Sequence, residues 1–221
     1  MNLKKSKNVV VTGNPTKVKK MDIDITKKKK ILSDIGVKGD LPIVLIFGGS
    51  QGAQKINEAV FDLINNGLNE KYQIILSCGA KQFDIMKEKF ELEGKNINNL
   101  KNTKILPYIY NMAEMMNIAD LLVCRSGAMT VTEVAIVGKP AIFVPLPSKM
   151  ANRQEDNAKV LEKIGAAKII NNEEINYKNL SLKIDEIILD ENRLSNMGRQ
   201  ANKLAVENVE EKIYNEIIKL I

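Results

Sequence analysis

The chain of 221 residues is 44% hydrophobic and 27% charged, which suits a folded domain with a sizeable core and excludes a disordered chain. It contains no histidine, which excludes Ser-His-Asp and Cys-His catalysis and histidine-ligated metal sites. The net charge of +6 is concentrated in residues 1–30, which hold ten lysines and two acids. We expect these lysines to be solvated; attraction to an anionic membrane surface or to nucleic acid is the alternative.

Seven short apolar runs are predicted to be strands: Val9–Thr12, Ile43–Phe47, Gln73–Ser77, Thr103–Leu106, Leu121–Cys124, Ala141–Val144 and Ala167–Ile170. Several are continuously apolar, which indicates strands buried on both faces of a parallel sheet. Helical patterns lie between them and after the last one, at Gln51–Leu68, Asn152–Ile164, Lys178–Leu189, Glu191–Glu207 and Val209–Ile221. This alternation predicts an α/β fold, a Rossmann-like doubly wound parallel sheet with C-terminal helices.

Three smaller features follow from the same patterns. The thiols of Cys78 and Cys124 lie in apolar runs and are expected to be buried and free. No apolar run reaches the ~18 residues of a membrane span, and no signal peptide is expected. The apolar stripe of the last helix must dock on this domain or on another one.

A glycine-rich loop, FGGSQGA (47–53), follows the Ile43–Phe47 strand and opens a helix. Glycines let the backbone approach a ligand closely, and the free N–H groups of a helix start suit a phosphate. Ser50 can cap the helix or donate to a phosphate oxygen. The loop matches neither the dinucleotide fingerprint nor a P-loop, so a tight turn without a ligand is the alternative.

A second loop, CRSGAMTVTE (124–133), also leaves a buried strand and enters a helix. The amides of Ala128, Met129 and Thr130 would form a second anion site at the helix start. The Glu133 carboxylate, one turn later, could accept hydrogen bonds from two sugar hydroxyls. Its alternative role is that of an acid favoured by the helix dipole.

A third polar cluster, NRQEDNA (152–158), opens a helix after two prolines. The amides of Gln154 and Asn157 lie three residues apart on one face and suit sugar hydroxyls, whereas capping by Asn152 is the alternative. The pair Asp22 and Asp24 has the letters of a metal-binding motif but is expected to be a helix entry. Met115 and Met116 are expected to be helix core.

Four stretches together resemble the C-terminal half of one family: VVVTGNPTKV (9–18), VLIFGGSQGAQKINEAV (44–60), ILPYIYNMAEMMNIADLLVCRSGAMTVTEVAIVGKPAIFVPLP (105–147) and NRQEDNAKVLEKIGAA (152–167). This is the MurG family of bacterial GlcNAc transferases, glycosyltransferase family 28. The resemblance implies one half of a GT-B fold. Residues 9–221 would form the UDP-sugar-binding domain after a basic segment, 1–8, and the acceptor domain would be absent.

The resemblance also implies roles for individual residues. The two loops would hold the diphosphate, the backbone of Ile109 beside Tyr108 would read the uracil, Glu133 would bind the ribose and Gln154 the GlcNAc. Arg125 would support the second loop. The expected UDP-sugar-binding residues are Gly49, Ser50, Gln51, Gly52, Tyr108, Ile109, Arg125, Gly127, Ala128, Met129, Thr130, Glu133 and Gln154, with Asn14, Lys17 and Asn157 as further candidates. The family usually has arginine where Lys17 stands, and lysine keeps the positive charge but lacks the planar guanidinium.

The function implied by the resemblance is that of the UDP-GlcNAc-binding half of an inverting, metal-independent hexosyltransferase in peptidoglycan synthesis. No catalytic residue, cofactor or metal is expected in this chain. An acceptor-binding half or separate subunit would bring the lipid-linked acceptor, and no nucleic acid is expected. The implied location is cytoplasmic and peripheral at the inner face of the cell membrane. The alternatives are a non-enzymatic or degenerate sugar-nucleotide module and a fragment like a UDP-GlcNAc epimerase.

Overall fold

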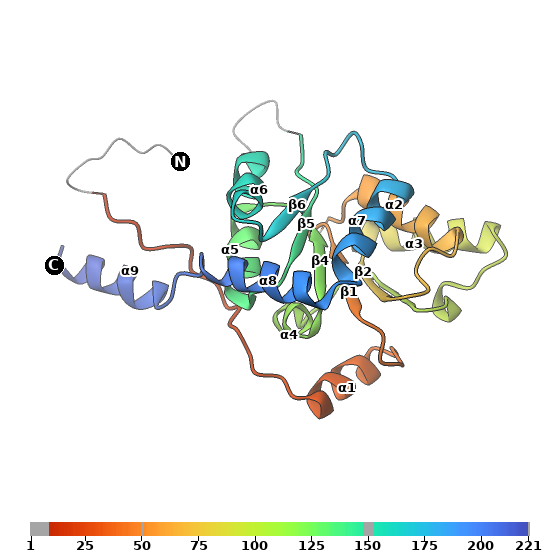
Figure 1. Cartoon of the computed structure of the whole chain (residues 1–221), viewed down its shortest axis with the longest axis horizontal. Helices are drawn as coiled ribbons and strands as arrows, with labels where there is room; N and C mark the ends of the chain where they lie inside the picture. The colour runs from red at the N-terminus through yellow and green to blue at the C-terminus, as the bar shows by residue number, and fades with distance from the viewer. Residues whose placement is uncertain (1–8, 50, 148–152, 221) are drawn as a thin grey trace.

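A single parallel sheet lies at the centre of the molecule (Figure 1). The structure, a computed structural model, describes residues 9–49, 51–147 and 153–220. The strand order is β3-β2-β1-β4-β5-β6, and every neighbouring pair is parallel. The strands are β1 (Ile43–Phe47), β2 (Gln73–Ser77), β3 (Thr103–Leu106), β4 (Leu121–Cys124), β5 (Ala141–Phe143) and β6 (Ala167–Ile169). The predicted doubly wound sheet is therefore confirmed, with the strand order reversing between β1 and β4.

Helices cover both faces of the sheet, and each face has its own core. The strand β1 shows why its sequence is continuously apolar: Val44 and Ile46 point into one core, whereas Ile43, Leu45 and Phe47 point into the other. The first core is covered by α2 (Gln54–Asn65), α3 (Ala80–Leu92) and α7 (Tyr177–Ile188). The second is covered by α1 (Ile25–Asp34), α4 (Met112–Ile118), α5 (Ala128–Val137) and α6 (Gln154–Lys163).

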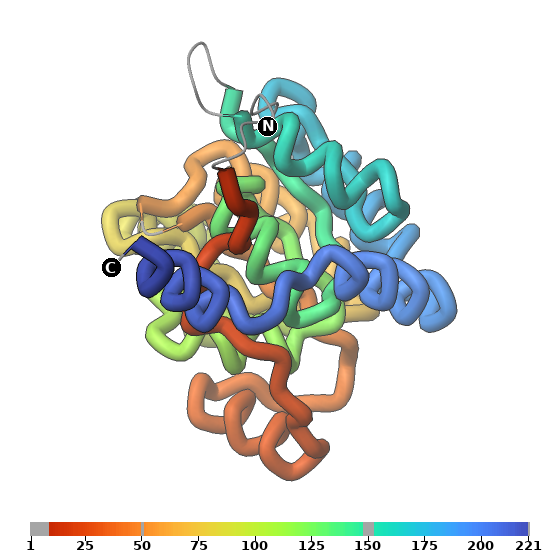
Figure 2. The backbone as a smooth tube through the Cα atoms, turned by 90° about the vertical axis from the view of Figure 1, so that its left-hand side faces the viewer, coloured from red at the N-terminus to blue at the C-terminus, as the bar shows by residue number. Residues whose placement is uncertain are grey.

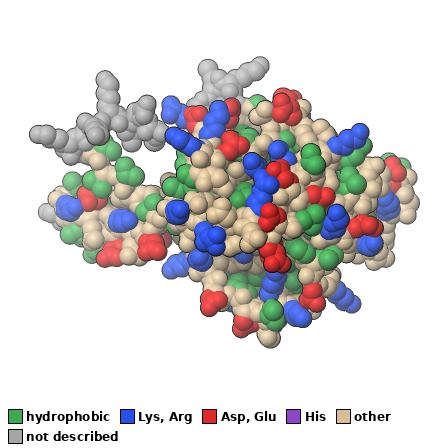
Figure 3. Space-filling model, viewed as in Figure 1, with side chains coloured by type: hydrophobic (Ala, Val, Ile, Leu, Met, Phe, Trp, Pro, Cys, Tyr) green, Lys and Arg blue, Asp and Glu red, His purple; other side chains and the backbone are tan. Residues whose placement is uncertain are grey.

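Two further helices end the chain, α8 (Glu191–Asn202) and α9 (Val209–Ile218). The predicted helix Glu191–Glu207 is too long, because the chain turns after Asn202 and Asn208 takes a left-handed φ of 53°. Figure 1 shows α9 extending away from the body, and Figure 3 shows hydrophobic side chains on this lobe. Val209 is buried, but Tyr214, Ile217 and Leu220 are exposed. The predicted apolar stripe is thus mostly uncovered in this chain.

The predicted strand Val9–Thr12 is wrong. These residues have no strand structure, and the side chain of Val11 is 86% exposed. The segment that follows packs on helices instead of the sheet: Gly13 lies against Val209, as Figures 1 and 2 also show by the closeness of this segment to α9. Among the described residues no strand pairs with this segment, so its valines stay outside the sheet.

Smaller expectations are confirmed. The Asp24 side chain caps α1 by accepting from the backbone N–H of Lys27 at 2.7 Å. Met115 and Met116 are buried in α4, and both thiols are buried and free. In the described ranges, no helix is both long and apolar enough to cross a membrane. The expected basic segment 1–8 lies outside the described residues.

Candidate functional site

A cavity of about 580 Å³ lies at the carboxyl ends of β1 and β4, where the strand order reverses. Open α/β sheets bind ligands at this switch point. The cavity gathers the loops that the sequence singled out. Its lining residues are Phe47, Gly48, Gly49, Gln51, Gly52, Ala53, Gln54, Lys55, Arg125, Gly127, Thr130, Leu146, Gln154 and Asn172.

The glycine-rich loop is closely packed on its inner side and open toward the cavity. A Cβ on Gly52 would lie 1.9 Å from the carbonyl oxygen of Cys78, and Gly52 has a φ of 75°. Gly49 has a φ of 87°, but a Cβ there would meet nothing within 4 Å. These positive φ values also delay the helix: α2 begins at Gln54 and not at the predicted Gln51. Ser50, expected to donate to a phosphate, lies outside the described residues.

Two helix N-termini meet at this cavity. The residues before α2 and α5 are Ala53 and Gly127, and neither supplies a side-chain cap. Both residues line the cavity. A helix start without a side-chain cap keeps its N–H groups for a ligand, and the helix dipole adds positive potential there. The arrangement therefore suits an anion with more than one phosphate group.

The second and third loops are tied to each other by hydrogen bonds. The buried Ser126 hydroxyl donates to the Gln154 carbonyl at 2.7 Å, and Asn157 Nδ2 donates to the Ser126 carbonyl at 3.1 Å. The backbone N–H of Leu146 donates to Gln154 Oε1 at 2.9 Å. Asn157 thus holds the loop after β4 in place, and Gln154 both orders a loop and lines the cavity.

Arg125 joins the ends of three strands. Its Nη1 donates to the carbonyl of Val144 at 2.9 Å and to Asn172 Oδ1 at 2.7 Å, and burial lowers the pKa of its guanidinium. A second cation of the lining, Lys55 in the first turn of α2, is paired with Glu173. Lys55 and Asn172 were missed from the sequence. The sequence signal for Asn172 is its place in the loop that follows β6, and that for Lys55 is its place at the start of α2.

Several predicted residues lie outside this lining. Tyr108 is 47% exposed and Ile109 is buried, both in the loop after β3. Ala128 and Met129 belong to the exposed first turn of α5, and Lys17 is also exposed. The remaining predicted residues outside the lining are Glu133, Asn14 and Asn157. The lining unites Gly49, Gln51, Gly52, Arg125, Gly127, Thr130 and Gln154.

Glu133 is held by the segment before α1. The Thr16 hydroxyl donates to Glu133 Oε1 at 2.9 Å, and Asn14 Nδ2 donates to the Thr132 hydroxyl at 2.9 Å. The pKa of the Cys124 thiol, at the end of β4, is raised mainly by burial and secondly by the negative charge of Glu133. The carboxylate therefore lies close to the same carboxyl edge of the sheet as the cavity.

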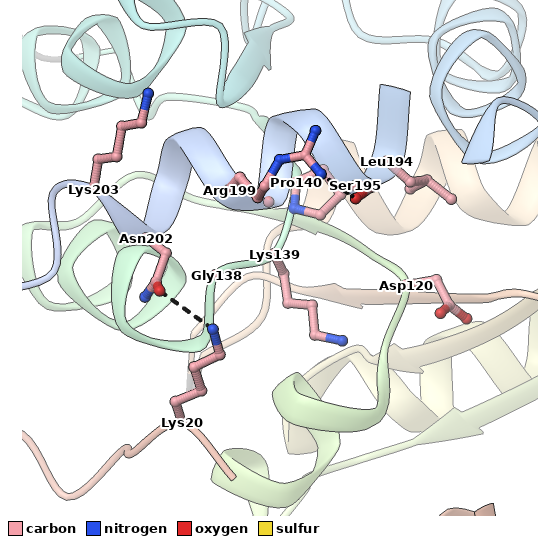
Figure 4. Close-up of a pocket in the computed structure, with 11 residues that line it drawn as sticks. Lys20, Asp120, Gly138, Lys139, Pro140, Leu194, Ser195, Arg199, Asn202 and Lys203 are labelled. Carbon is pink, nitrogen blue, oxygen red and sulfur yellow. Dashed lines mark hydrogen bonds between the residues drawn. The ribbon is translucent and has the colours of Figure 1, made fainter. Parts of the chain in front are cut away.

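A second cavity, of about 490 Å³, is lined by basic residues but has a different character (Figure 4). Lys20 Nζ donates to Asn202 Oδ1 at 3.2 Å, and burial lowers the pKa of Lys139. In Figure 4 the amine of Lys203 points away from that of Lys20, so the cations do not converge on one point. Gly138, in this lining, ends α5, where basic side chains offset the helix dipole. The described residues include no group of three or more metal-ligating His, Cys, Asp or Glu side chains.

Comparison with known proteins agrees with this architecture. A UDP-N-acetylglucosamine--N-acetylmuramyl-(pentapeptide) pyrophosphoryl-undecaprenol N-acetylglucosamine transferase of Acetivibrio thermocellus is 40% identical over 218 residues, which are 98% of this chain and 56% of that protein. The crystal structure of Acinetobacter baumannii MurG is 32% identical with a TM-score of 0.70, over 85% of this chain and 52% of that one. The chain thus spans about half the length of these relatives.

More distant structures share the fold alone. A UDP-GlcNAc 2-epimerase from Neisseria meningitidis, solved with UDP-GlcNAc, is 12% identical with a TM-score of 0.58, over 88% of this chain and 49% of that one. Residues 43–213 match the family description "Glycosyltransferase family 28 C-terminal domain". With this match over most of its length, the chain belongs to glycosyltransferase family 28 and contains that family's C-terminal domain.

Proposed function

We propose that this chain is the donor-binding half of a GlcNAc transferase of peptidoglycan synthesis. UDP-GlcNAc occupies the cavity between the loops after β1 and β4, and a lipid-linked muramyl-pentapeptide acceptor is brought by an acceptor-binding half. One observation carries this proposal: two helix starts without side-chain caps line one cavity at the switch point of a family 28 domain. The name of the Acetivibrio relative, a GlcNAc transferase, supports the choice of sugar and acceptor.

The chemistry needs little from this chain beyond electrostatics. The acceptor hydroxyl attacks C1 of GlcNAc from the face opposite UDP, so the configuration inverts. The bond from C1 to the β-phosphate oxygen breaks, and UDP leaves with the electron pair while the hydroxyl proton goes to a base in the acceptor half. Each helix start stabilises the growing phosphate charge by about 0.3–2 kcal/mol. Arg125 adds positive charge to the same lining, where Lys55 is paired with Glu173, and we assign the diphosphate to these groups and the two helix starts without a metal.

The residue roles follow from this placement. The amides at the starts of α2 and α5 bind the diphosphate, the Glu133 carboxylate binds the ribose hydroxyls and the Ile109 backbone reads the uracil. Gln154 contacts the sugar. Asn157 supports the Ser126 loop by donating one amide N–H to the Ser126 carbonyl.

Turnover requires the acceptor half. Positioning the attacking hydroxyl supplies up to about 7–11 kcal/mol in well-oriented reactions, and nothing in this chain is assigned to that task. The relatives are about twice as long as this chain. The exposed Tyr214 and Ile217 of α9, with Leu220 just after the helix, offer apolar surface that such a half would cover. An assembled enzyme of this kind would act peripherally at the inner face of the cell membrane, where its lipid-linked acceptor lies.

Calorimetry tests the proposal directly. We expect UDP-GlcNAc to bind in the presence of a chelator and more tightly than UDP-glucose or ADP-glucose. Glu133→Ala should weaken binding about tenfold or more, because the ribose hydroxyls lose a charged acceptor. Glu88→Ala, at an exposed position of α3 outside the cavity lining, is the matched control. Failure of the folded chain to bind any UDP-sugar would contradict the proposal.

A further inference from the structure

The segment Asn14–Val18 crosses the first turns of α5 and is fixed there at both ends. Asn14 donates to Thr132, and the Val18 side chain is only 8% exposed, in the core that covers one face of the sheet. Gly13 before it lies against Val209, with no room for a larger side chain. The backbone of this segment is therefore held independently of any single side chain in its middle.

Thr16 lies in the middle of this segment, and its hydroxyl has a defined direction. The backbone N–H of Val18 donates to Thr16 Oγ1 at 3.2 Å, and Thr16 Oγ1 donates to Glu133 Oε1 at 2.9 Å. A hydroxyl has one proton, so the bond accepted from Val18 leaves that proton for the carboxylate. Threonine is also stiff at χ1, which fixes the position of the oxygen.

We propose that Thr16 is a positioning residue that fixes the plane of the Glu133 carboxylate for the ribose. The terminal torsion of a glutamate is broad, so an unsupported carboxylate samples many orientations. To accept hydrogen bonds from two neighbouring ribose hydroxyls, the carboxylate must hold one particular orientation. A carboxylate has about four acceptor positions, so the bond from Thr16 still leaves capacity for both hydroxyls. The inference rests on the proposed function, because it takes the ribose as the ligand of Glu133.

The test compares UDP with 2′-deoxy-UDP by calorimetry. Wild-type protein should prefer UDP, and Glu133→Ala should remove most of that preference. Thr16→Val keeps the shape of the side chain but loses the hydroxyl, and we expect the preference to fall about three- to tenfold, up to about 1.4 kcal/mol. Thr16→Ser should restore it. Thr12→Val is the control, since within the described part of the chain the Thr12 hydroxyl donates only to the adjacent Gly13 carbonyl, at 3.4 Å.

The outcomes separate the two ideas. If Glu133→Ala removes the preference and Thr16→Val leaves it unchanged, the positioning role is wrong and the proposed function stands. If Glu133→Ala leaves it unchanged, or folded wild-type protein does not bind UDP, the ribose role fails and this inference fails with it. Should Thr16→Val not fold, Thr16→Ser and Thr16→Ala form the comparison. A merely structural role would lower affinity for both nucleotides equally.

Discussion

Replacing single glycines by alanine separates packing from ligand contact in the glycine-rich loop. Gly49, Gly52 and the distant Gly67 all have a positive φ, of 87°, 75° and 68°. An added Cβ meets nothing within 4 Å at Gly49 and Gly67, but at Gly52 it lies 1.9 Å from the Cys78 carbonyl oxygen. An alanine at any of the three sites would therefore strain the backbone. Only at Gly52 would its Cβ also clash with a backbone atom, and only Gly49 and Gly52 line the cavity.

The magnitudes follow from these geometries. Left-handed strain alone should cost Gly67→Ala and Gly49→Ala about 1–2 kcal/mol of unfolding free energy. In Gly52→Ala the clash with Cys78 costs about 1–3 kcal/mol more, because the loop must move to make room for the Cβ. The total loss of unfolding free energy is then about 2–5 kcal/mol. Of the two milder variants, only Gly49→Ala should weaken UDP binding, because Gly49 lines the cavity that is proposed to hold the diphosphate.

Urea unfolding at 25 °C gives the stabilities, and calorimetry with UDP gives the affinities. Gly67→Ala serves as the control for strain without ligand contact. Equal stabilities of Gly52→Ala and Gly67→Ala would refute the packing argument. A Gly49→Ala variant that binds UDP as well as wild type would refute the contact between this loop and the diphosphate.

Three further predictions concern the body of the domain. Arg125→Met should cost about 2–3 kcal/mol, measured by urea unfolding, since it leaves the Val144 carbonyl and the Asn172 amide oxygen without their charged donor. Burial raises the pKa of Asp185, so its stabilising contribution is present below the unfolded pKa of about 3.9 and is lost as pH rises through the folded pKa. Asp185→Asn should therefore be more stable than wild type at pH 7, with the difference shrinking toward pH 4 in thermal unfolding. Burial raises the pKa of Cys78 to about 11, so iodoacetamide at pH 8 should alkylate it far more slowly in native than in urea-unfolded protein; equal rates would contradict the burial.

The sheet could be predicted from the sequence because its central strands β1 and β4 are apolar on both faces. The runs IVLIF and LLVC have no polar side to expose, and β1 is indeed buried along its whole length. The run VVVT at 9–12 is similarly apolar but pairs with no described strand, and composition alone cannot show whether a partner strand lies beside it. The start of α2 was misplaced because the φ of Gly52 depends on the close approach of Cys78.

The loops of the candidate site could be predicted from the sequence, but the long-range hydrogen bonds between them could not. Glycines and small residues after a strand mark where a helix begins, so Gly49, Gly52 and Gly127 could be found from local sequence. The bond from Thr16 to Glu133 joins residues 117 positions apart, and that from Arg125 to Asn172 joins residues 47 positions apart. Such pairs depend on the strand order and on the path of the N-terminal segment, which no local pattern contains.

Amide chemical-shift mapping with UDP in the presence of a chelator tests the central claim most directly. If the two helix starts hold the diphosphate, the largest shifts should fall on the amides of residues 49–55 and 127–130. Uridine, which lacks phosphate, should shift these amides far less. Shifts gathered around Lys20 and Lys139 in the second cavity, or none in a folded protein, would contradict the account.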